Sequence, residues 1–274
     1  MSDGTRVVGI VGWPVEHSLS PTIHNAAFRA LDLDWVYVPL PVRPGEIADA
    51  LTGLRALDFT GVNVTMPHKR DAMLGCAELS EDARLTGAVN TLLRGADGFV
   101  GHNTDVGGFQ RFLERDAGFV ATGKRALLYG AGGAARAVVL ALSRAGIDAV
   151  TMAARDADRG RDTARELAGW APRVDVVQWD EAREVRADLV VNASPARGFP
   201  VVAMGPETLV VDLVYRPADT GLVRLARERG ASAFGGLGML LHQAALSFEL
   251  WTGQVPPIDV MSAAALAELA EGSR

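Results

Sequence analysis

Lys69 is the residue whose side-chain type points most directly to chemistry. The chain has 27 lysine and arginine residues, yet Lys69 and Lys124 are its two lysines. An amine can release a proton and take it back, whereas an arginine stays protonated at any working pH. In the run NVTMPHK, Asn63 and Thr65 alternate onto one face of an expected strand, and Lys69 follows the strand end. These side chains are candidates for ligand binding and proton transfer; a surface lysine at the start of a helix is the alternative.

Asparagine and aspartate side chains stand on both sides of an expected hairpin. Asn90 lies at its start, and Asn103 and Asp105 follow it. A carboxylate near Lys69 would set the protonation and orientation of the amine. The alternative is ordinary turn chemistry, which favours the same residue types.

Two serines lie in a loop that leads into an expected helix. The run HSLSP contains Ser18 and Ser20. Hydroxyl groups together with helix-end N–H groups can hold a carboxylate without a formal positive charge. The alternative is structural, with Ser20 as the N-cap of a helix that begins at Pro21 and Ser18 as a plain loop residue.

The segment Gly130–Ala135 reads GAGGAA and fits the pattern G-x-G-x-x-G/A. It follows an expected strand and opens an expected helix. In that context glycines let the backbone approach a pyrophosphate, and the helix N-terminus favours its negative charge. An ordinary tight turn is the alternative, but the next expected strand also falls in place. The pattern therefore indicates a dinucleotide site.

The residues after the next expected strand distinguish NAD from NADP. An NAD site usually offers an acid to the ribose 2′-hydroxyl at this point. Arg155 and Arg159 stand here instead, and they suit a 2′-phosphate through charge-assisted, often bidentate hydrogen bonds. Asp156 and Asp158 lie nearby and could neutralise the two arginines. The pattern favours NADP(H) over NAD(H).

Short β-rich runs alternate with helical runs along the chain, which is typical of α/β proteins. Strands are expected over residues 7–11, 35–40, 61–65, 89–93, 98–101, 125–129, 149–153, 189–192 and 210–213, with 89–93 and 98–101 forming a hairpin. Helices are expected over residues 21–31, 47–57, 107–114, 134–145, 161–168, 222–229, 239–251 and 263–270. From residue 125 onward the succession is that of a doubly wound parallel sheet.

The composition argues against several classes of partner. The net charge is −6 and no long basic run occurs, so nucleic acid and anionic membranes are not expected to bind. No apolar run approaches the roughly 18 residues of a membrane span and no leader pattern is seen, so a cytoplasmic protein without a membrane span is expected. Cys76 is the one cysteine, which excludes an intrachain disulfide, and the five histidines lack ligand spacing, so no metal site is expected.

Taken together, the motifs resemble the shikimate dehydrogenase family almost from end to end. The matching runs begin at Gly12 (GWPVEHSLSPTIHN), Asn63 (NVTMPHK), Gly87 (GAVNT), Gly101 (GHNTD), Gly130 (GAGGAA), Asn192 (NASP), Asp212 (DLVYRP), Gly238 (GML), Gln243 (QA) and Trp251 (WTG). Several runs are weak individually, but their order and spacing are specific. The resemblance implies NADP-dependent, reversible reduction of 3-dehydroshikimate to shikimate by hydride transfer, in the shikimate pathway of aromatic amino acid biosynthesis.

The resemblance also implies a two-domain fold and a set of site residues. An α/β substrate-binding domain would cover residues 1–105, completed by 240–274, and a Rossmann-like NADP domain would cover 106–239, with a cleft between them. Lys69 and Asp105 would form the catalytic pair. The substrate-binding residues would be Ser18, Ser20, Asn63, Thr65, Asn90, Tyr215 and Gln243, and the cofactor-binding residues Gly130, Ala131, Gly132, Gly133, Ala134, Arg155, Arg159, Gly238 and Met239. The implied ligands are NADP(H) and shikimate or 3-dehydroshikimate, and a homodimer is an open option.

Three positions, Ala154, Asp156 and Ser194, depart from the family pattern. Ala154-Arg155-Asp156 stands where NADP enzymes of the family usually carry Asn-Arg-Thr or Asn-Arg-Ser, and Ser194 stands where threonine is usual. An NAD-dependent dehydrogenase of quinate, shikimate or aminoshikimate is the alternative enzyme. A sensor that binds nucleotide and shikimate-like acids without turnover is the alternative outside enzymes, although it would have no use for an acid/base pair.

Overall fold

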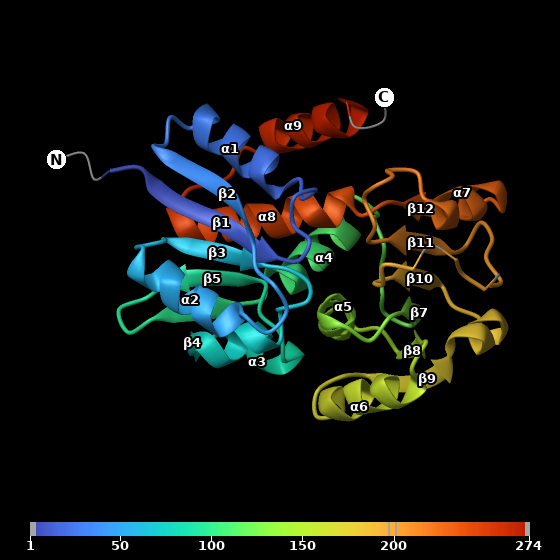
Figure 1. The fold of residues 1–274 in the computed structure, drawn as a ribbon. Helices are drawn as coiled ribbons and strands as arrows, with labels where there is room; N and C mark the ends of the chain where they lie inside the picture. Colours follow the sequence, from blue (N-terminus) through green and yellow to red (C-terminus); the bar gives the residue numbers. More distant parts are fainter. Residues whose placement is uncertain (1–3, 197, 201, 272–274) are drawn as a thin grey trace. The chain divides into compact units, whose positions relative to one another are not determined.

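The chain divides into two compact units. The computed structural model describes residues 4–196, 198–200 and 202–271. One unit is Met1–Thr104 with Leu241–Arg274, and the other is Asp105–Leu240. Over the described residues each unit is built around a six-stranded sheet, and helices alternate with strands along the chain (Figure 1). The expected α/β fold class is confirmed.

The sheet of the first unit has the order β2-β1-β3-β5-β6-β4. Its strands are β1 (Arg6–Gly12), β2 (Trp35–Pro41), β3 (Gly61–Val64), β4 (Cys76–Leu79), β5 (Thr91–Arg94) and β6 (Phe99–His102). β1 is parallel to β2 and β3, so these three strands present their carboxyl ends at one edge. β5 is antiparallel to β6, which confirms the expected hairpin, and the turn is closed by a hydrogen bond of 2.7 Å from Gly95 N to Gly98 O.

Helices pack around this first sheet. They are α1 (Ser20–Ala30), α2 (Ile47–Ala56), α3 (Glu81–Thr86), α9 (Ile258–Glu271) and most of α8 (Leu237–Thr252), with a 3-10 turn η1 (Asp71–Gly75). α1 packs against β2 and α9, the blue and red helices of Figure 1. The apolar face of α2 buries Ile47, Leu51 and Leu54 in one core with Val62 and Val64 of β3.

Trp251 ties α8 to the first sheet. Its indole Nε1 donates a hydrogen bond of 3.0 Å to the carbonyl oxygen of Leu92, in β5. A Cβ atom on Gly61, in β3, would lie 2.3 Å from the same Nε1, so this close approach requires glycine. Residues far apart in sequence therefore share one core.

The sheet of the second unit has the order β12-β11-β10-β7-β8-β9, and its neighbouring strands are parallel. The strands are β7 (Arg125–Tyr129), β8 (Ala149–Ala154), β9 (Arg173–Gln178), β10 (Leu189–Asn192), β11 (Leu209–Asp212) and β12 (Ser232–Phe234). With β7 as strand 1 and read from β9, this is the order 3-2-1-4-5-6 of a doubly wound dinucleotide-binding sheet. The strand order reverses between β7 and β10, and ligands of such sheets bind beyond the carboxyl ends of the strands at this point.

The helices of the second unit include one that is buried on nearly all sides. The unit contains α4 (Thr104–Arg115, from its second residue), α5 (Gly133–Arg144), α6 (Ala157–Leu167), α7 (Gly221–Glu228) and the 3-10 turn η2 (Trp179–Glu184). Every residue of α5 from Ala135 to Leu142 is buried. A helix that is covered all round stays inside the fold, so α5 has little freedom to move.

The strands β4, β9 and β12, the short helix α3 and the two 3-10 turns are not among the elements expected from the sequence. The three strands lie at sheet edges; β4 and β12 are short, and β9 carries polar side chains at alternate positions. For α3 a signal was present in the sequence. The Ser80 hydroxyl accepts a hydrogen bond of 3.3 Å from Ala83 N at its start, and Gly87 ends it with a φ of +59°.

His24, in α1, is a fully buried histidine in an aromatic cluster. Its ring stacks on Tyr37 with centroids 4.6 Å apart and an interplanar angle of 1°, and Phe248 and Trp251 lie beside it. Within the described structure neither ring nitrogen has a hydrogen-bond partner. Burial lowers the pKa of His24 to about 3, because the charged form would lose its hydration.

This lowered pKa should make stability fall with acidity. The unfolded chain protonates His24 below its ordinary pKa of 6.5, whereas the folded chain does so only below about 3, so protons favour the unfolded state between these values. From pH 7 to pH 5 the protein should lose about 2 kcal/mol of unfolding free energy through this residue. His24→Phe should remove that part of the loss, as measured by urea denaturation at both pH values.

The exposed His17 supplies the control, because His17→Phe removes no buried group and should leave the loss between the two pH values intact. An equal loss in the parent and in His24→Phe would show that His24 does not contribute.

Candidate active site

The predicted substrate-binding residues of the first unit gather at the carboxyl ends of β1 and β3. Ser18 and Ser20 follow β1, and Thr65 and Lys69 follow β3. The two segments are joined by backbone hydrogen bonds of 2.9 Å, from Thr65 N to Val11 O and from Trp13 N to Met66 O. A Cβ atom on Gly12 would lie 2.3 Å from Thr65 Cγ2, so glycine is required where they meet. Carboxyl ends of parallel strands are where α/β proteins bind ligands.

Ser20 is not the N-cap of the helix that follows the loop, and Ser18 is more than a plain loop residue. α1 begins at Ser20, and its N-cap is Leu19, so the assignment of Ser20 as N-cap is wrong. The hydroxyl of Ser18 accepts a hydrogen bond of 3.2 Å from Ser20 N, and Pro21 occupies the first turn, where a missing N–H costs nothing. Ser20 is 4% exposed and is therefore placed at the buried start of the helix without serving as its cap.

Three predicted ring-binding amides lie in one buried hydrogen-bonded group. Asn63 Nδ2 donates to Asn90 O at 3.1 Å, and Asn90 Nδ2 lies 3.4 Å from Gln243 Oε1. The Asn90 side-chain oxygen accepts from Thr104 N at 2.7 Å. Side chains that the sequence does not single out complete the group, because Asn63 Nδ2 also reaches the Ser247 hydroxyl at 3.0 Å. A buried amide held on several sides has a fixed orientation.

Tyr37 fixes the other end of the Asn63 amide. Its hydroxyl donates a hydrogen bond of 2.8 Å to Asn63 Oδ1. Asn25 holds the backbone of Tyr37 with two hydrogen bonds, from Asn25 Nδ2 to Tyr37 O at 2.9 Å and from Tyr37 N to Asn25 Oδ1 at 2.8 Å. The stacked ring of His24 covers one face of the tyrosine. His24 and Asn25, in the run that begins at Gly12, thus hold Tyr37, which in turn holds the Asn63 amide.

The two predicted catalytic residues lie in differently supported segments. The backbone of Lys69 accepts a hydrogen bond of 2.7 Å from Val89 N, and the neighbouring His68 is buried, with its Nε2–H donating to Val42 O at 2.7 Å. The side chain of Lys69 is half-buried. Asp105 is 5% exposed and stands in the first turn of α4, where a carboxylate is favoured by the helix N-terminus. Lys69 belongs to the first unit, and Asp105 is the first residue of the second.

The predicted pyrophosphate loop follows β7 and ends in α5. Gly130 has a φ of +114°, and a Cβ there would lie 2.9 Å from Ala193 O, so the turn requires glycine. A Cβ on Gly132 would meet no atom within 4 Å, so the loop has open space at this residue. Gly132 is the N-cap of α5 and offers no capping side chain. Uncapped N–H groups beside open space fit a bound pyrophosphate.

The predicted 2′-phosphate residues, Arg155 and Arg159, are both exposed, at the end of β8 and in the first turn of α6. The acids beside them have other partners. Asp156 caps α6 and accepts a hydrogen bond of 3.1 Å from Arg159 N, whereas Asp158 pairs with Arg161 at 2.6 Å. Each carboxylate thus binds a group other than the guanidinium groups of Arg155 and Arg159, and these two groups suit an anionic ligand.

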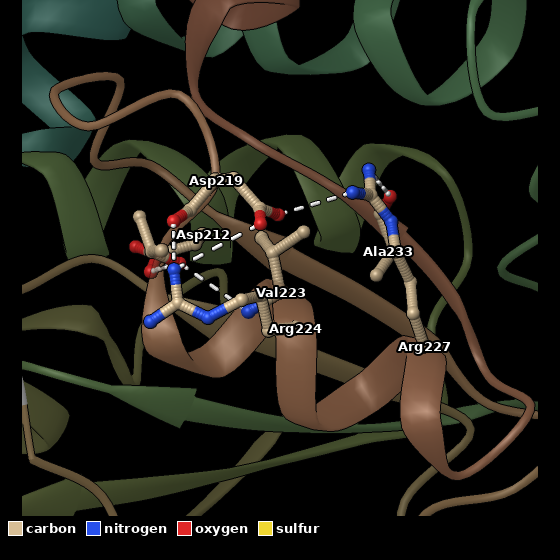
Figure 2. Close-up of polar contacts among 7 residues, drawn as sticks. Asp212, Asp219, Val223, Arg224, Arg227 and Ala233 are labelled. Carbon is tan, nitrogen blue, oxygen red and sulfur yellow. Dashed lines mark hydrogen bonds and ion pairs between the residues drawn. The ribbon is translucent and has the colours of Figure 1, made fainter. Parts of the chain in front are cut away.

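Asp212 organises the loop that bears Tyr215. Its carboxylate accepts hydrogen bonds from Asn192 Nδ2 at 2.7 Å, from Val214 N at 3.1 Å and from the Thr220 hydroxyl at 2.6 Å. Figure 2 shows Asp212 behind the start of α7. The loop is therefore fixed at both ends by one buried carboxylate.

Ion pairs between Asp219 and two arginines of α7 also hold this loop. Asp219, at the far end, accepts from Arg224 and Arg227 of α7, and Arg227 also donates to Ala233 O at 3.2 Å (Figure 2). These groups are half-exposed, so they contribute little to stability compared with Asp212.

The remaining predicted cofactor residues lie at the start of α8. Gly238 is packed so closely that a Cβ there would lie 2.6 Å from the Phe112 ring, and Met239 is 8% exposed. Within the described residues no group of three or more histidine, cysteine, aspartate or glutamate side chains could hold a metal ion. Over the same residues no helix is both long and apolar enough to cross a membrane.

Comparison with known proteins connects these features to one family. Residues 10–92 match the shikimate dehydrogenase substrate binding domain, and residues 236–266 match the shikimate 5′-dehydrogenase C-terminal domain. The shikimate dehydrogenase (NADP(+)) of Desulforamulus reducens is 42% identical, over 98% of this chain and 97% of its own length. That of Methanopyrus kandleri is 44% identical, over 97% and 96%. The chain belongs to the shikimate dehydrogenase family.

Solved structures of the shikimate dehydrogenase family share the fold. A shikimate dehydrogenase in complex with NADP+ has a TM-score of 0.89 at 35% identity, covering 97% of this chain and 96% of its own. The Thermus thermophilus shikimate 5-dehydrogenase, solved with NADP(H) and shikimate, has a TM-score of 0.82 at 36% identity, covering 96% and 99%. The expected family is confirmed.

Removing the Tyr37 hydroxyl should test the amide group. Tyr37→Phe leaves Asn63 Oδ1 without its 2.8 Å donor, and an unsatisfied buried acceptor costs about 1–3 kcal/mol. We expect a loss of unfolding free energy in this range and a higher KM for shikimate, because the amide group can then reorient. Urea denaturation and steady-state kinetics measure the two effects.

Trp35→Phe is the control, because Trp35 lies in the same strand and its ring is tilted against Phe28, with no hydrogen bond to the Asn63 amide among the described contacts. Parent-like stability and KM in Tyr37→Phe would contradict a supporting role for the hydroxyl.

Proposed function

We propose that this chain catalyses the NADP-dependent, reversible reduction of 3-dehydroshikimate to shikimate, a step of aromatic amino acid biosynthesis. The observation that carries the proposal is the buried amide group of Asn63, Asn90 and Gln243 in the same unit as Lys69. A ring with several hydroxyls needs fixed donors and acceptors, and its oxidation needs a group that takes a proton. The Thermus thermophilus relative, solved with NADP(H) and shikimate, supports the same ligands here.

The substrate carboxylate would be held by uncharged groups. Ser18 and Ser20, at the start of α1, would bind the carboxylate together with Tyr215. The ring hydroxyls would be bound by Asn63, Thr65, Asn90, Asp105 and Gln243. A protein with a net charge of −6 has no global positive field for an anionic acid, so local donors must supply the attraction.

Lys69 would transfer the proton. In the reducing direction its ammonium group gives a proton to the oxygen that develops negative charge, and in the oxidising direction the neutral amine takes the hydroxyl proton. Asp105 would orient the ammonium group and a ring hydroxyl. NADPH, when bound, would supply the hydride for this reduction.

The cofactor would be bound by the second unit. The loop of Gly130, Ala131, Gly132, Gly133 and Ala134 would hold the pyrophosphate with its backbone N–H groups. Arg155 and Arg159 would bind the 2′-phosphate, supported by the engagement of Asp156 and Asp158 with other partners. Gly238 and Met239 would lie beside the nicotinamide.

This assignment gives each part of the chain a task. Residues 1–105 with 240–274 would form the substrate domain, and residues 106–239 the NADP domain. We also propose a cytoplasmic location, supported by the single cysteine, Cys76, which fits a reducing compartment. A homodimer is the proposed assembly, and analytical ultracentrifugation would test it by measuring the mass of the protein in solution.

An NAD-dependent quinate dehydrogenase is the second candidate. The quinate dehydrogenase of Corynebacterium glutamicum, solved in complex with NAD, has a TM-score of 0.87 at 31% identity, covering 97% of this chain and 100% of its own. The acid at Asp156 also departs from the usual NADP pattern. Initial rates with both cofactors and both acids separate the two candidates.

Cofactor choice should depend on the two exposed arginines. Replacing both, as Arg155→Ala with Arg159→Ala, should lower kcat/KM for NADP(H) about tenfold or more, because charge-assisted hydrogen bonds are lost. The kcat/KM for NAD(H) should change little. Arg161→Ala is the control on the same helix, since Arg161 pairs with Asp158. Equal rates of the parent with the two cofactors would refute the assignment.

Lys69 should act as a proton carrier and not merely as a positive charge. Lys69→Arg keeps the charge but cannot accept the hydroxyl proton, so both Lys69→Arg and Lys69→Ala should lose kcat in shikimate oxidation by roughly 10²–10⁴-fold. Affinity for NADP+ should barely change, because Lys69 lies outside the unit that contains the glycine loop.

Lys124→Arg is the matched control, because it replaces the other lysine, which pairs with Asp188 at 3.2 Å. Steady-state rates with thermal melts check all three variants. A folded Lys69→Arg protein within about threefold of the parent kcat, far from the loss expected of an acid/base group, would exclude the proton-carrier role.

A further inference from the structure

Thr163, in α6, reaches the glycine loop from a neighbouring helix. The residue is 2% exposed, and its hydroxyl donates a hydrogen bond of 3.2 Å to the carbonyl oxygen of Ala131. Ala131 lies in the middle of the loop between β7 and α5. This contact joins the loop to the helix whose first turn carries Arg159.

Arg136 binds the Thr163 hydroxyl on its acceptor side and so leaves its hydrogen for the Ala131 carbonyl. The guanidinium group of Arg136, in α5, is 2% exposed, donates to the Thr163 hydroxyl at 3.3 Å and pairs with Glu166 at 2.5 Å. A guanidinium can only donate, so the threonine oxygen must accept from it. The hydroxyl hydrogen is then left for the Ala131 carbonyl. The chain of contacts therefore runs from Glu166 through Arg136 and Thr163 to the loop.

Holding one carbonyl of a peptide also sets the direction of the next N–H. In the described residues the cis peptide bonds all precede proline, so the bond between Ala131 and Gly132 is trans. In a trans peptide the C=O and the following N–H point in opposite directions. Because the Ala131 carbonyl points to α6, the N–H of Gly132 points away from α6, and the loop has open space at this glycine.

We propose that Thr163 is a positioning residue for the cofactor: it orients the peptide between Ala131 and Gly132 so that the Gly132 N–H can donate to the pyrophosphate. The inference rests on the proposed function, which places the pyrophosphate at this loop. NADP(H) and NAD(H) share the pyrophosphate and differ at the 2′-phosphate. Thr163 therefore acts equally on both cofactors, whereas Arg155 and Arg159 act on NADP(H) alone.

Dissociation constants for NADP+ and NAD+, measured by titration calorimetry, test this role. Thr163→Val keeps the shape and removes the hydroxyl, so both constants should rise by the same factor, about three- to tenfold for one neutral hydrogen bond. Thr163→Ser keeps the hydroxyl and should restore both constants to within about twofold of the parent. The dissociation constant for shikimate should stay unchanged in both variants.

Thr208→Val is the matched control. Thr208 is also buried in the second unit, and its hydroxyl accepts from Gly205 N at 3.2 Å before β11, at the amino end of the parallel strands and so away from the glycine loop. It should leave both cofactor constants at the parent values. If Thr163→Val does not fold, Thr163→Ala carries the same expectation.

Two results would overturn the proposal. One is an unchanged pair of constants in Thr163→Val, and the other is a loss confined to NADP+, which would place the effect at Arg159. Failure of the proposed function would appear in the parent protein itself, as equal affinity for the two cofactors or no turnover of shikimate. Failure of the role of Thr163 would appear only between the parent and the Thr163 variants.

Discussion

The hydrogen bonds of the Asn63 side chain are the interaction on which the first unit's site depends. They join β2, β5 and α8 through Tyr37, Thr91 and Ser247. A buried amide without partners would destabilise the fold, whereas a satisfied one fixes its neighbours. The same bonds that make the core polar thus fix the orientation of the amide groups that we propose to bind the substrate. The hydrogen bonds that stabilise the fold are therefore the ones that set the geometry of the proposed site.

In the second unit a buried carboxylate, that of Asp212, has the corresponding role. Asp212 is 1% exposed, and its carboxylate is stabilised by hydrogen bonds from Asn192, Val214 and Thr220. On the other side of the switch in strand order, Arg136 and Thr163 hold the glycine loop. The loops that follow β7 and β11 at the carboxyl edge of the parallel sheet are therefore each tied down by a buried polar group. Loops held in this way are ordered before any ligand arrives.

Sequence reasoning found the features with a local signal. The runs NVTMPHK and GAGGAA are contiguous, and long apolar strands and helices are periodic, so the fold class and the family could be predicted. Supporting residues could not, because their partners are distant: Tyr37 and Asn63 are 26 positions apart, and Asn63 and Ser247 are 184 apart. The N-cap assignment failed for a local reason, since Ser20 is already the first residue of α1 and Leu19 is its N-cap. The roles assigned to the site residues remain predictions.

The contact of Trp251 with Gly61 and Leu92 affects the order in which the two units can fold during translation. A ribosome delivers the chain from its amino end, and domains fold as units while synthesis proceeds. The second unit is one continuous stretch, Asp105–Leu240, and has all its strands before Trp251 has been added. The strands β1, β3 and β5 are made first, yet their sheet must wait for that indole to cover it. The part of the protein that is translated first is therefore completed last.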